Sequence, residues 1–169
     1  KGSGARPCGR VGGIDSVVNI ARGKPITLVA QPVHRYRAEG PSTLIDGSLA
    51  SLDFLDGKWL GFRGNDLEAV IDLEEVRDIK GVEVRFLRNQ TSGIFLPEKL
   101  TIAASSDSIH FTVIHEASID NTTQDLGIIA KELGFTGTAE ARYLHVMARG
   151  IGNCPDWHPG RNEPGWLFV

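Results

Sequence analysis

Alternation of apolar and polar residues dominates the readable parts of the chain. The segment 67–73 (LEAVIDL) is apolar at every second position, with Val70 as the one apolar residue on its polar side. The segment 82–86 (VEVRF) alternates without exception, and the segment 143–148 (YLHVMA) repeats the pattern. Because successive side chains of a strand point to opposite faces, each segment predicts a half-buried β-strand.

Turn residues separate these segments and two further predicted strands, at 100–104 and 111–114. Asp-Gly pairs at 46–47 and 56–57 favour tight turns. Only residues 123–134 look briefly helical, and two glycines and a β-branched pair weaken that pattern. Many short strands with regular turns predict an all-β fold, an antiparallel β-sandwich or jelly roll.

Composition and charge narrow the class of protein. The 169 residues fit one domain, and 18 basic residues are nearly balanced by 21 acidic ones. This balance gives no electrostatic reason to expect a nucleic acid or an anionic lipid as partner. No apolar stretch approaches the roughly 20 residues that cross a bilayer. We therefore expect no nucleic-acid partner and no membrane insertion.

The two ends of the sequence suggest a domain from a longer chain. We expect residues 1–14 to be a linker or leader and residues 15–169 to be the folded domain. The only cysteines are Cys8 and Cys154, too few for a disulfide scaffold, so the core must stabilise the fold. The two could form a bridge, since domain termini often lie close together, or remain unpaired thiols. The second alternative is slightly favoured.

The most informative residues form a series of short motifs. LIDG at 44–47 and DFLDGKWLGF at 53–62 precede the strands 67–73 and 82–87, and IFLPEKL, ASSDSIHF and ARYLHV follow. In this order and spacing they resemble the discoidin domains, also called coagulation factor C-type or galactose-binding-like domains. Bacterial carbohydrate enzymes carry such domains as family 32 carbohydrate-binding modules. The resemblance covers roughly residues 17–169.

Longer blocks resemble a narrower group of these modules. DGKWLGFRGNDLEAVIDL, GIFLPEKLTIAASSD, CPDWHPG and GWLFV look like the domain behind the catalytic domain of bacterial family 20 β-hexosaminidases, often named chitobiases. The resemblance implies a discoidin-type jelly roll and a non-catalytic role within a secreted glycoside hydrolase. The implied partners are a glycan containing N-acetylhexosamine or galactose and the catalytic domain of the parent enzyme. The implied location is bacterial: secreted, periplasmic or at the cell surface.

The resemblance also implies a structural calcium ion. Relatives hold Ca²⁺ with hard oxygen ligands in a loop that matches residues 44–51. The expected ligands are the Asp46 carboxylate, backbone carbonyls near Leu44 and Leu49, and Ser51. Relatives add a glutamate just after the last strand, where this sequence reaches Val169. The alternative is that Asp46 is an ordinary Asp-Gly turn residue.

Sugar binding requires an aromatic face for the C–H surface of the ring and polar side chains for its hydroxyls. Three loops are expected to supply them: the Trp59 loop, the Arg88–Phe95 loop and the Asn153–Arg161 loop. Two prolines stiffen the last loop, which lowers the entropy cost of holding an exposed indole. The expected sugar-binding residues are Trp59, Arg88, Asn89, Gln90, Phe95, Asn153, Trp157 and His158.

Burial is the alternative for some of these aromatic residues. Trp59 and Phe95 could instead plug the ends of the sandwich. For Phe95, which lies between two aliphatic residues, burial is the favoured alternative; for Trp59 both remain open. Trp166 lies in the final apolar run and is expected in the core.

Catalysis by this chain is the competing class of function. A glycosidase needs two carboxylates on opposite sides of the scissile bond, but Asp53, Asp56, Asp66 and Asp72 lie in turns and at a sheet edge without evident pairing. The five histidines show no HExxH spacing. We expect no catalysis by this domain. Two non-catalytic alternatives remain: packing against the catalytic domain to orient it, or binding a protein.

Overall fold

The computed structural model describes residues 18–169, and most of its regular elements are strands. The expected leader and Cys8 lie outside the described residues. Cys154 is buried, and this burial raises the pKa of its thiol. The strands are β1 (Ile26–Leu28), β2 (Gly61–Arg63), β3 (Leu67–Arg88), β4 (Lys99–Ser105), β5 (Thr112–Ser118), β6 (Ile129–Arg149) and β7 (Trp166–Phe168). The 3-10 turns are η1 (His34–Tyr36), η2 (Pro41–Ile45) and η3 (Gln90–Ser92).

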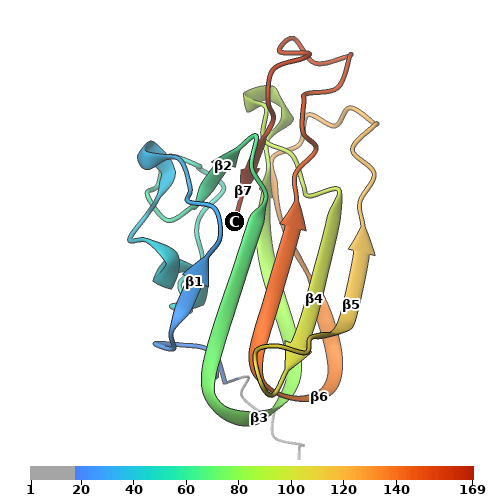
Figure 1. Ribbon diagram of the computed structural model, residues 1–169. Helices are drawn as coiled ribbons and strands as arrows, with labels where there is room; N and C mark the ends of the chain where they lie inside the picture. The colour runs from blue at the N-terminus through green and yellow to red at the C-terminus, as the bar shows by residue number, and fades with distance from the viewer. Residues whose placement is uncertain (1–17) are drawn as a thin grey trace, which may run out of the picture.

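The described strands form one antiparallel sheet that curls into two layers. The order is β2-β7-β3-β6-β4-β5, and β1 pairs with β3. The two longest strands, β3 and β6, pair from Leu67↔Ala148 to Arg88↔Ile129. Figure 1 shows both folding back at the same end of the molecule. The register shifts between Asp72 and Arg77 and between Ile79 and Gly81 lie in this bend. The all-β sandwich expected from the sequence is therefore confirmed.

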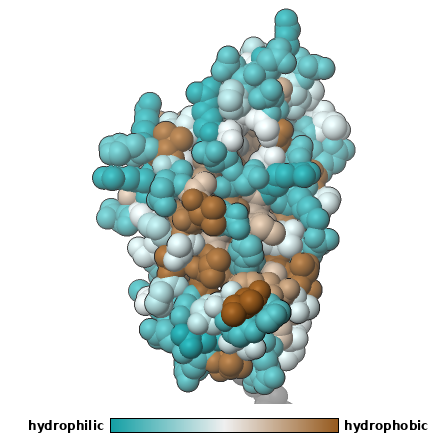
Figure 2. Space-filling view, in the orientation of Figure 1, coloured by the Kyte–Doolittle hydropathy of each residue, from teal (hydrophilic) through white to brown (hydrophobic). Residues whose placement is uncertain are grey.

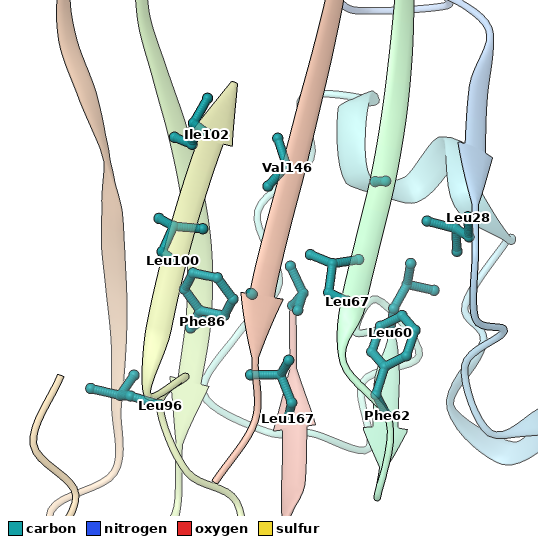
Figure 3. Packing of buried hydrophobic residues seen from close by; sticks show 13 residues of the cluster. Leu28, Leu60, Phe62, Leu67, Phe86, Leu96, Leu100, Ile102, Val146 and Leu167 are labelled. Atoms are coloured by element: carbon teal, nitrogen blue, oxygen red, sulfur yellow. The ribbon is translucent and has the colours of Figure 1, made fainter. Parts of the chain in front are cut away.

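The core lies between the two layers, as the alternation predicts. The apolar residues at positions 67, 69, 71 and 73 are buried, and the residues between them are half-buried on the outer face. Phe86, on the second half of β3, belongs to the same buried cluster as Leu100, Ile102 and Val146 from the other layer (Figure 3). Burying one such side chain contributes roughly 1.5–3 kcal/mol, so this cluster stabilises the stacked layers.

The brief helix expected over residues 123–134 is wrong. Residues 123–128 are a loop without regular structure, and β6 begins at Ile129. Gly134 pairs with Glu83 of β3, and a Cβ at Gly134 would clash with the backbone carbonyl of Val82. The glycine that weakens a helix is therefore required by close strand pairing.

Loops gather at the end of the sandwich opposite the bend, seen at the top of Figure 1. We call this end the rim, and define it as residues 63–66, 88–98, 120–128 and 150–165. In chain order these segments connect β2 to β3, β3 to β4, β5 to β6 and β6 to β7. Figure 2 shows mostly hydrophilic residues at this end, whereas hydrophobic residues gather lower on the sheet face.

Candidate functional site

The loop 150–165 is held by its own backbone. At its base Gly165 N–H donates to the Gly152 carbonyl at 2.8 Å, and Cys154 N–H donates to the Glu163 carbonyl at 2.8 Å. On this loop Trp157 is half-buried, and its indole Nε1 donates to the Thr122 carbonyl at 2.9 Å. The indole is therefore fixed in orientation while part of it faces solvent.

Two other rings, those of Phe95 and His158, contact the indole of Trp157. Its ring centroid lies 6.1 Å from that of Phe95 and 5.8 Å from that of His158. The Phe95 and His158 rings also contact each other, at 5.7 Å. Such tilted and edge-to-face contacts are favourable, so the indole rests on a rigid base.

His158 connects this loop to η3. Its Nε2 lies 2.7 Å from the Gln90 carbonyl, and its Nδ1 lies 2.9 Å from the Gly160 amide nitrogen. A carbonyl only accepts and an amide N–H only donates, so Nε2 carries the proton and Nδ1 is the acceptor. Both ring nitrogens are thus engaged within the protein. His158 therefore has a structural role, and its contact with a sugar hydroxyl stays a prediction.

Asn89 and Gln90 also hold the rim. The Asn89 carboxamide oxygen accepts from Ser92 N–H at 3.3 Å and so caps η3. Gln90 is only 2% exposed, and its amide oxygen accepts from Asp125 N–H at 2.6 Å while its Nε2 donates to the Thr123 carbonyl at 3.3 Å. Both residues therefore have a structural role, because the polar atoms of Gln90 are buried and the amide oxygen of Asn89 caps a turn. Their contacts with sugar stay a prediction.

Arg88 is committed to the same neighbouring loop. Its guanidinium forms an ion pair with Asp125 at 2.6 Å, and its side chain is 16% exposed. The Gly127 backbone N–H and the Arg88 guanidinium hold the pKa of Asp125 below its ordinary value. This ion pair positions residues 121–128, and a contact between Arg88 and sugar stays a prediction. Sequence reasoning missed this loop, although Asp125-Leu126-Gly127 is a recognisable turn signal.

Two predicted stacking residues are in the core. Trp59 is 2% exposed, packs with Leu87, Ile94 and Phe168, and donates its indole N–H to the Ser51 carbonyl at 3.0 Å. Phe95 is 1% exposed. Neither ring offers a face to a ligand, so the alternative of plugging the sandwich holds for both. Of the predicted sugar-binding residues, the half-buried Trp157 and the exposed Asn153 remain available.

A second aromatic cluster lies beside the rim and was not predicted. Tyr36, Phe54 and Trp166 are each half-buried, and the Tyr36 and Trp166 rings meet edge to face at 5.2 Å. The Arg63 guanidinium lies 5.5 Å from the centroid of the Trp166 ring. Trp166 was expected in the core but is only partly covered. Tyr36 escaped notice because its basic neighbours made the segment 34–37 resemble a solvated loop.

The calcium loop fits the ion only in part. Asp46 accepts from Ser48 N–H at 2.6 Å through one carboxylate oxygen. Ser51 donates its hydroxyl proton to Asp56 at 2.8 Å and accepts from Trp59 through its carbonyl, so its oxygens serve the protein. Ca²⁺ takes six to eight oxygens, more than Asp46 and the carbonyls of Leu44 and Leu49 supply. Calcium at this loop stays a prediction.

No group of three or more His, Cys, Asp or Glu side chains within residues 18–169 is placed to hold a metal ion. No helix in this part of the chain is long and apolar enough to span a membrane.

Solved structures share this fold at low sequence identity. The first carbohydrate-binding module of family 32 from a family 31 glycoside hydrolase of Clostridium perfringens aligns with a TM-score of 0.53 and 16% identity over 79% of this chain and 89% of its own. Chitosan-binding module 1 of a chitosanase/glucanase from Paenibacillus sp. IK-5 aligns with a TM-score of 0.52 and 18% identity. The alignment covers 88% of this chain and 92% of the module. A C. perfringens family 32 module in complex with GlcNAc-α-1,4-galactose aligns with a TM-score of 0.51 and 15% identity. The alignment covers 90% of this chain and 94% of the module.

Sequence comparisons add nothing to this likeness, since no protein-family model matches the chain and no curated protein matches it significantly. The structural likeness shows the fold: the chain has the β-sandwich fold of these modules.

Proposed function

We propose that this domain is a non-catalytic carbohydrate-binding module that holds glycans at its rim. The observation that carries the proposal is the Trp157 indole, which is partly exposed, hydrogen-bonded to the Thr122 carbonyl and supported by Phe95. A sugar ring stacks its C–H face on such an indole, and a fixed indole loses little entropy on binding. The hydrophilic surface of the rim supports a hydroxyl-rich ligand (Figure 2).

The structural neighbours support the same class of ligand. One is a chitosan-binding module, and another was solved with a disaccharide of N-acetylglucosamine and galactose. Tyr36 and Trp166 offer a further aromatic surface next to the same loop. The ligand we propose is a glycan containing N-acetylhexosamine or galactose. Its affinity should be modest, because a shallow site that buries one or two rings gains little net free energy.

The parent protein is proposed from the sequence blocks. Their likeness to the domain behind family 20 catalytic domains suggests a β-N-acetylhexosaminidase. Such an enzyme acts on glycans outside the cytoplasm, so we propose a secreted, periplasmic or cell-surface location in a bacterium. On this proposal the hydrolytic carboxylates belong to the catalytic domain, and the present domain alone should not hydrolyse a chromogenic N-acetylhexosaminide.

A titration of the domain tests the binding function. Isothermal calorimetry with N-acetylglucosamine, N-acetylgalactosamine and galactose-containing oligosaccharides should show binding. The Trp157→Ala variant should lose about tenfold or more in affinity, as expected for a central aromatic contact. Val113→Ala is the matched control, because Val113 is exposed on β5 away from the rim. Binding that is unchanged in Trp157→Ala would place the sugar elsewhere.

A protein-facing role is the second candidate function. Leu49, Leu52 and Leu55 are exposed large aliphatic residues on the loop before β2. Exposed apolar residues mark a protein contact when they form one patch, and the partner proposed here is the catalytic domain of the parent enzyme, whose orientation this domain would then fix. If no oligosaccharide binds with or without calcium, this role or another protein partner becomes the better account.

A further inference from the structure

A groove opens on the rim between the turn 63–66 and the base of the loop 150–165. Its volume is about 450 Å³, within the range of roughly 300–1,000 Å³ that is usual for small-molecule sites. Its position follows from the start of β3, the end of β6 and the chain leading into β7 (Figure 1). The lining residues are Gly64, Asn65, Asp66, Glu98, Arg149, Gly150, Ile151, Gly152, Gly165 and Leu167.

Two of the glycines cannot be replaced without changing the groove. Gly152 has a φ of +70°, a conformation that side chains rarely adopt. A Cβ on Gly165 would lie 2.9 Å from the Ile151 side chain, so Ile151 packs directly over that glycine. The backbone therefore forms part of the lining, and Ile151 supplies an apolar surface beside it.

The polar lining combines acceptors and donors. Asp66 accepts from Gly150 N–H at 2.9 Å through Oδ1, and within residues 18–169 its Oδ2 has no hydrogen-bond donor. Glu98 and Arg149 form an exposed ion pair at 3.1 Å. The Asn65 amide adds a group that both donates and accepts. Two carboxylates and one guanidinium give the lining a net charge of −1.

We propose that this groove is a second saccharide subsite, which takes one pyranose ring of an oligosaccharide that also contacts Trp157. The inference rests on the proposed function and specifies its ligand. Carboxylates accept from hydroxyls, a guanidinium donates to ring substituents, and an aliphatic side chain faces the C–H surface of the ring. The net negative lining favours neutral or amino sugars over uronates.

The two subsites share structural elements. Ile151, Gly152 and Gly165 line the groove, and Trp157 lies on the same loop. Phe95 contacts residues of both subsites: its ring contacts Trp157 and lies 3.5 Å from the position that a Cβ of Gly165 would occupy. On this proposal one oligosaccharide occupies both subsites, and affinity should rise with chain length.

Titration with N-acetylchito-oligosaccharides of one to six units tests this subsite. Wild-type affinity should rise about tenfold or more between the monosaccharide and the longer oligomers. Asp66→Asn, which retains the oxygen that accepts from Gly150, and Glu98→Gln should each remove most of this gain and leave monosaccharide binding unchanged. Glu75→Gln is the matched control, since Glu75 pairs with Arg77 in the bend at the opposite end. Oligogalacturonate should bind more weakly than the neutral oligomers.

Amide chemical shifts provide a readout that does not depend on the variants. Addition of the hexamer should shift the backbone amides of Gly150 and Gly152 together with the Trp157 indole N–H. If the indole signal moves and the glycine amides do not, or if both acid variants keep the full gain with length, the second subsite is excluded and the proposed function stands. If the wild-type domain binds no oligosaccharide, both proposals fail.

Discussion

At the residue scale, most polar side chains predicted to contact sugar fix the loops of the rim. Gln90 bonds to the loop 121–128 through its side chain and accepts from His158 through its carbonyl. Residue type and loop position predicted two of the loops of the rim, 88–95 and 153–161, but not the loop 120–128. They could not predict whether a given amide faces inward, because that depends on partners 30 or more positions away in the chain.

The aromatic residues show the same limit of sequence reasoning. Trp157 is flanked by Asp156 and two prolines, and this setting correctly predicted an indole at the surface. Trp59 follows an Asp-Gly turn, a setting that left both exposure and burial open, and β7 and the Ile94 segment cover it. Burial by a distant element leaves no local signal in the sequence.

Gly61 provides a prediction at this scale. A Cβ at this position would lie 2.8 Å from Cβ of Tyr36 and 2.9 Å from the Phe168 ring. Gly61→Ala should therefore destabilise the domain by about 1–3 kcal/mol through overpacking. Urea unfolding measures the change. Gly150→Ala is the matched control, because its Cβ would make only ordinary contacts, and an equal loss in both variants would contradict the explanation.

At the element scale, the two long strands carry features that periodicity did not reveal. The alternation at 67–73 and at 82–86 predicted two separate strands, and the structure joins them through a bend into β3. The residues between them, Glu74 to Lys80, are mostly exposed and lack a clear period. An ion pair joins the two strands at the edge of this bend: Arg142 of β6 donates to both carboxylate oxygens of Asp72, at 2.8 and 3.0 Å.

The Asp72–Arg142 pair predicts a dependence of stability on pH. The hydrogen bonds from Arg142 hold the pKa of Asp72 below its ordinary value. The pKa of an aspartate in the unfolded chain is about 3.9. The ion pair therefore stabilises the fold above that pH, and this contribution is lost as the pH falls below it. Asp72→Asn should lower stability at neutral pH and lose less stability than wild type between about pH 4 and pH 2. Urea unfolding across this range measures both, and Glu75→Gln, an exposed acid of the same bend, should behave like wild type.

The expected Ca²⁺ site in the loop 44–51 leads to a prediction about thermal stability. If Asp46 and neighbouring carbonyls hold Ca²⁺, excess calcium should raise the melting temperature and a chelator should reverse the rise. A ligand at one hundred times its Kd stabilises by about 2.7 kcal/mol. Asp46→Asn should abolish the shift, whereas Asp53→Asn should not, because Asp53 makes a similar turn bond to Leu55 N–H but is not an expected ligand. Identical melting with calcium and with chelator would exclude the ion.

At the scale of the whole molecule, the strands form the scaffold and the loops that connect them at one end form the rim. The all-β class and the buried faces followed from alternation alone, because burial of one strand face is a local pattern. The curling of one sheet into two layers depends on which strands pair, and composition does not encode that pairing. The aromatic surfaces of the rim depend on it in turn, since Tyr36 and Trp166 meet only after β7 joins the sheet.

This division into scaffold and rim predicts that stability and binding can be altered independently. Phe86 is fully buried between the layers, so Phe86→Ala should cost about 3–5 kcal/mol, a large part of the roughly 5–15 kcal/mol that holds a typical domain folded. Trp157→Ala removes a half-buried ring at the rim and should lower glycan affinity with a much smaller loss of stability. Thermal unfolding and calorimetry on the same two variants measure both quantities. If Trp157→Ala unfolded the domain as readily as Phe86→Ala, the indole would belong to the core rather than to a binding surface on it.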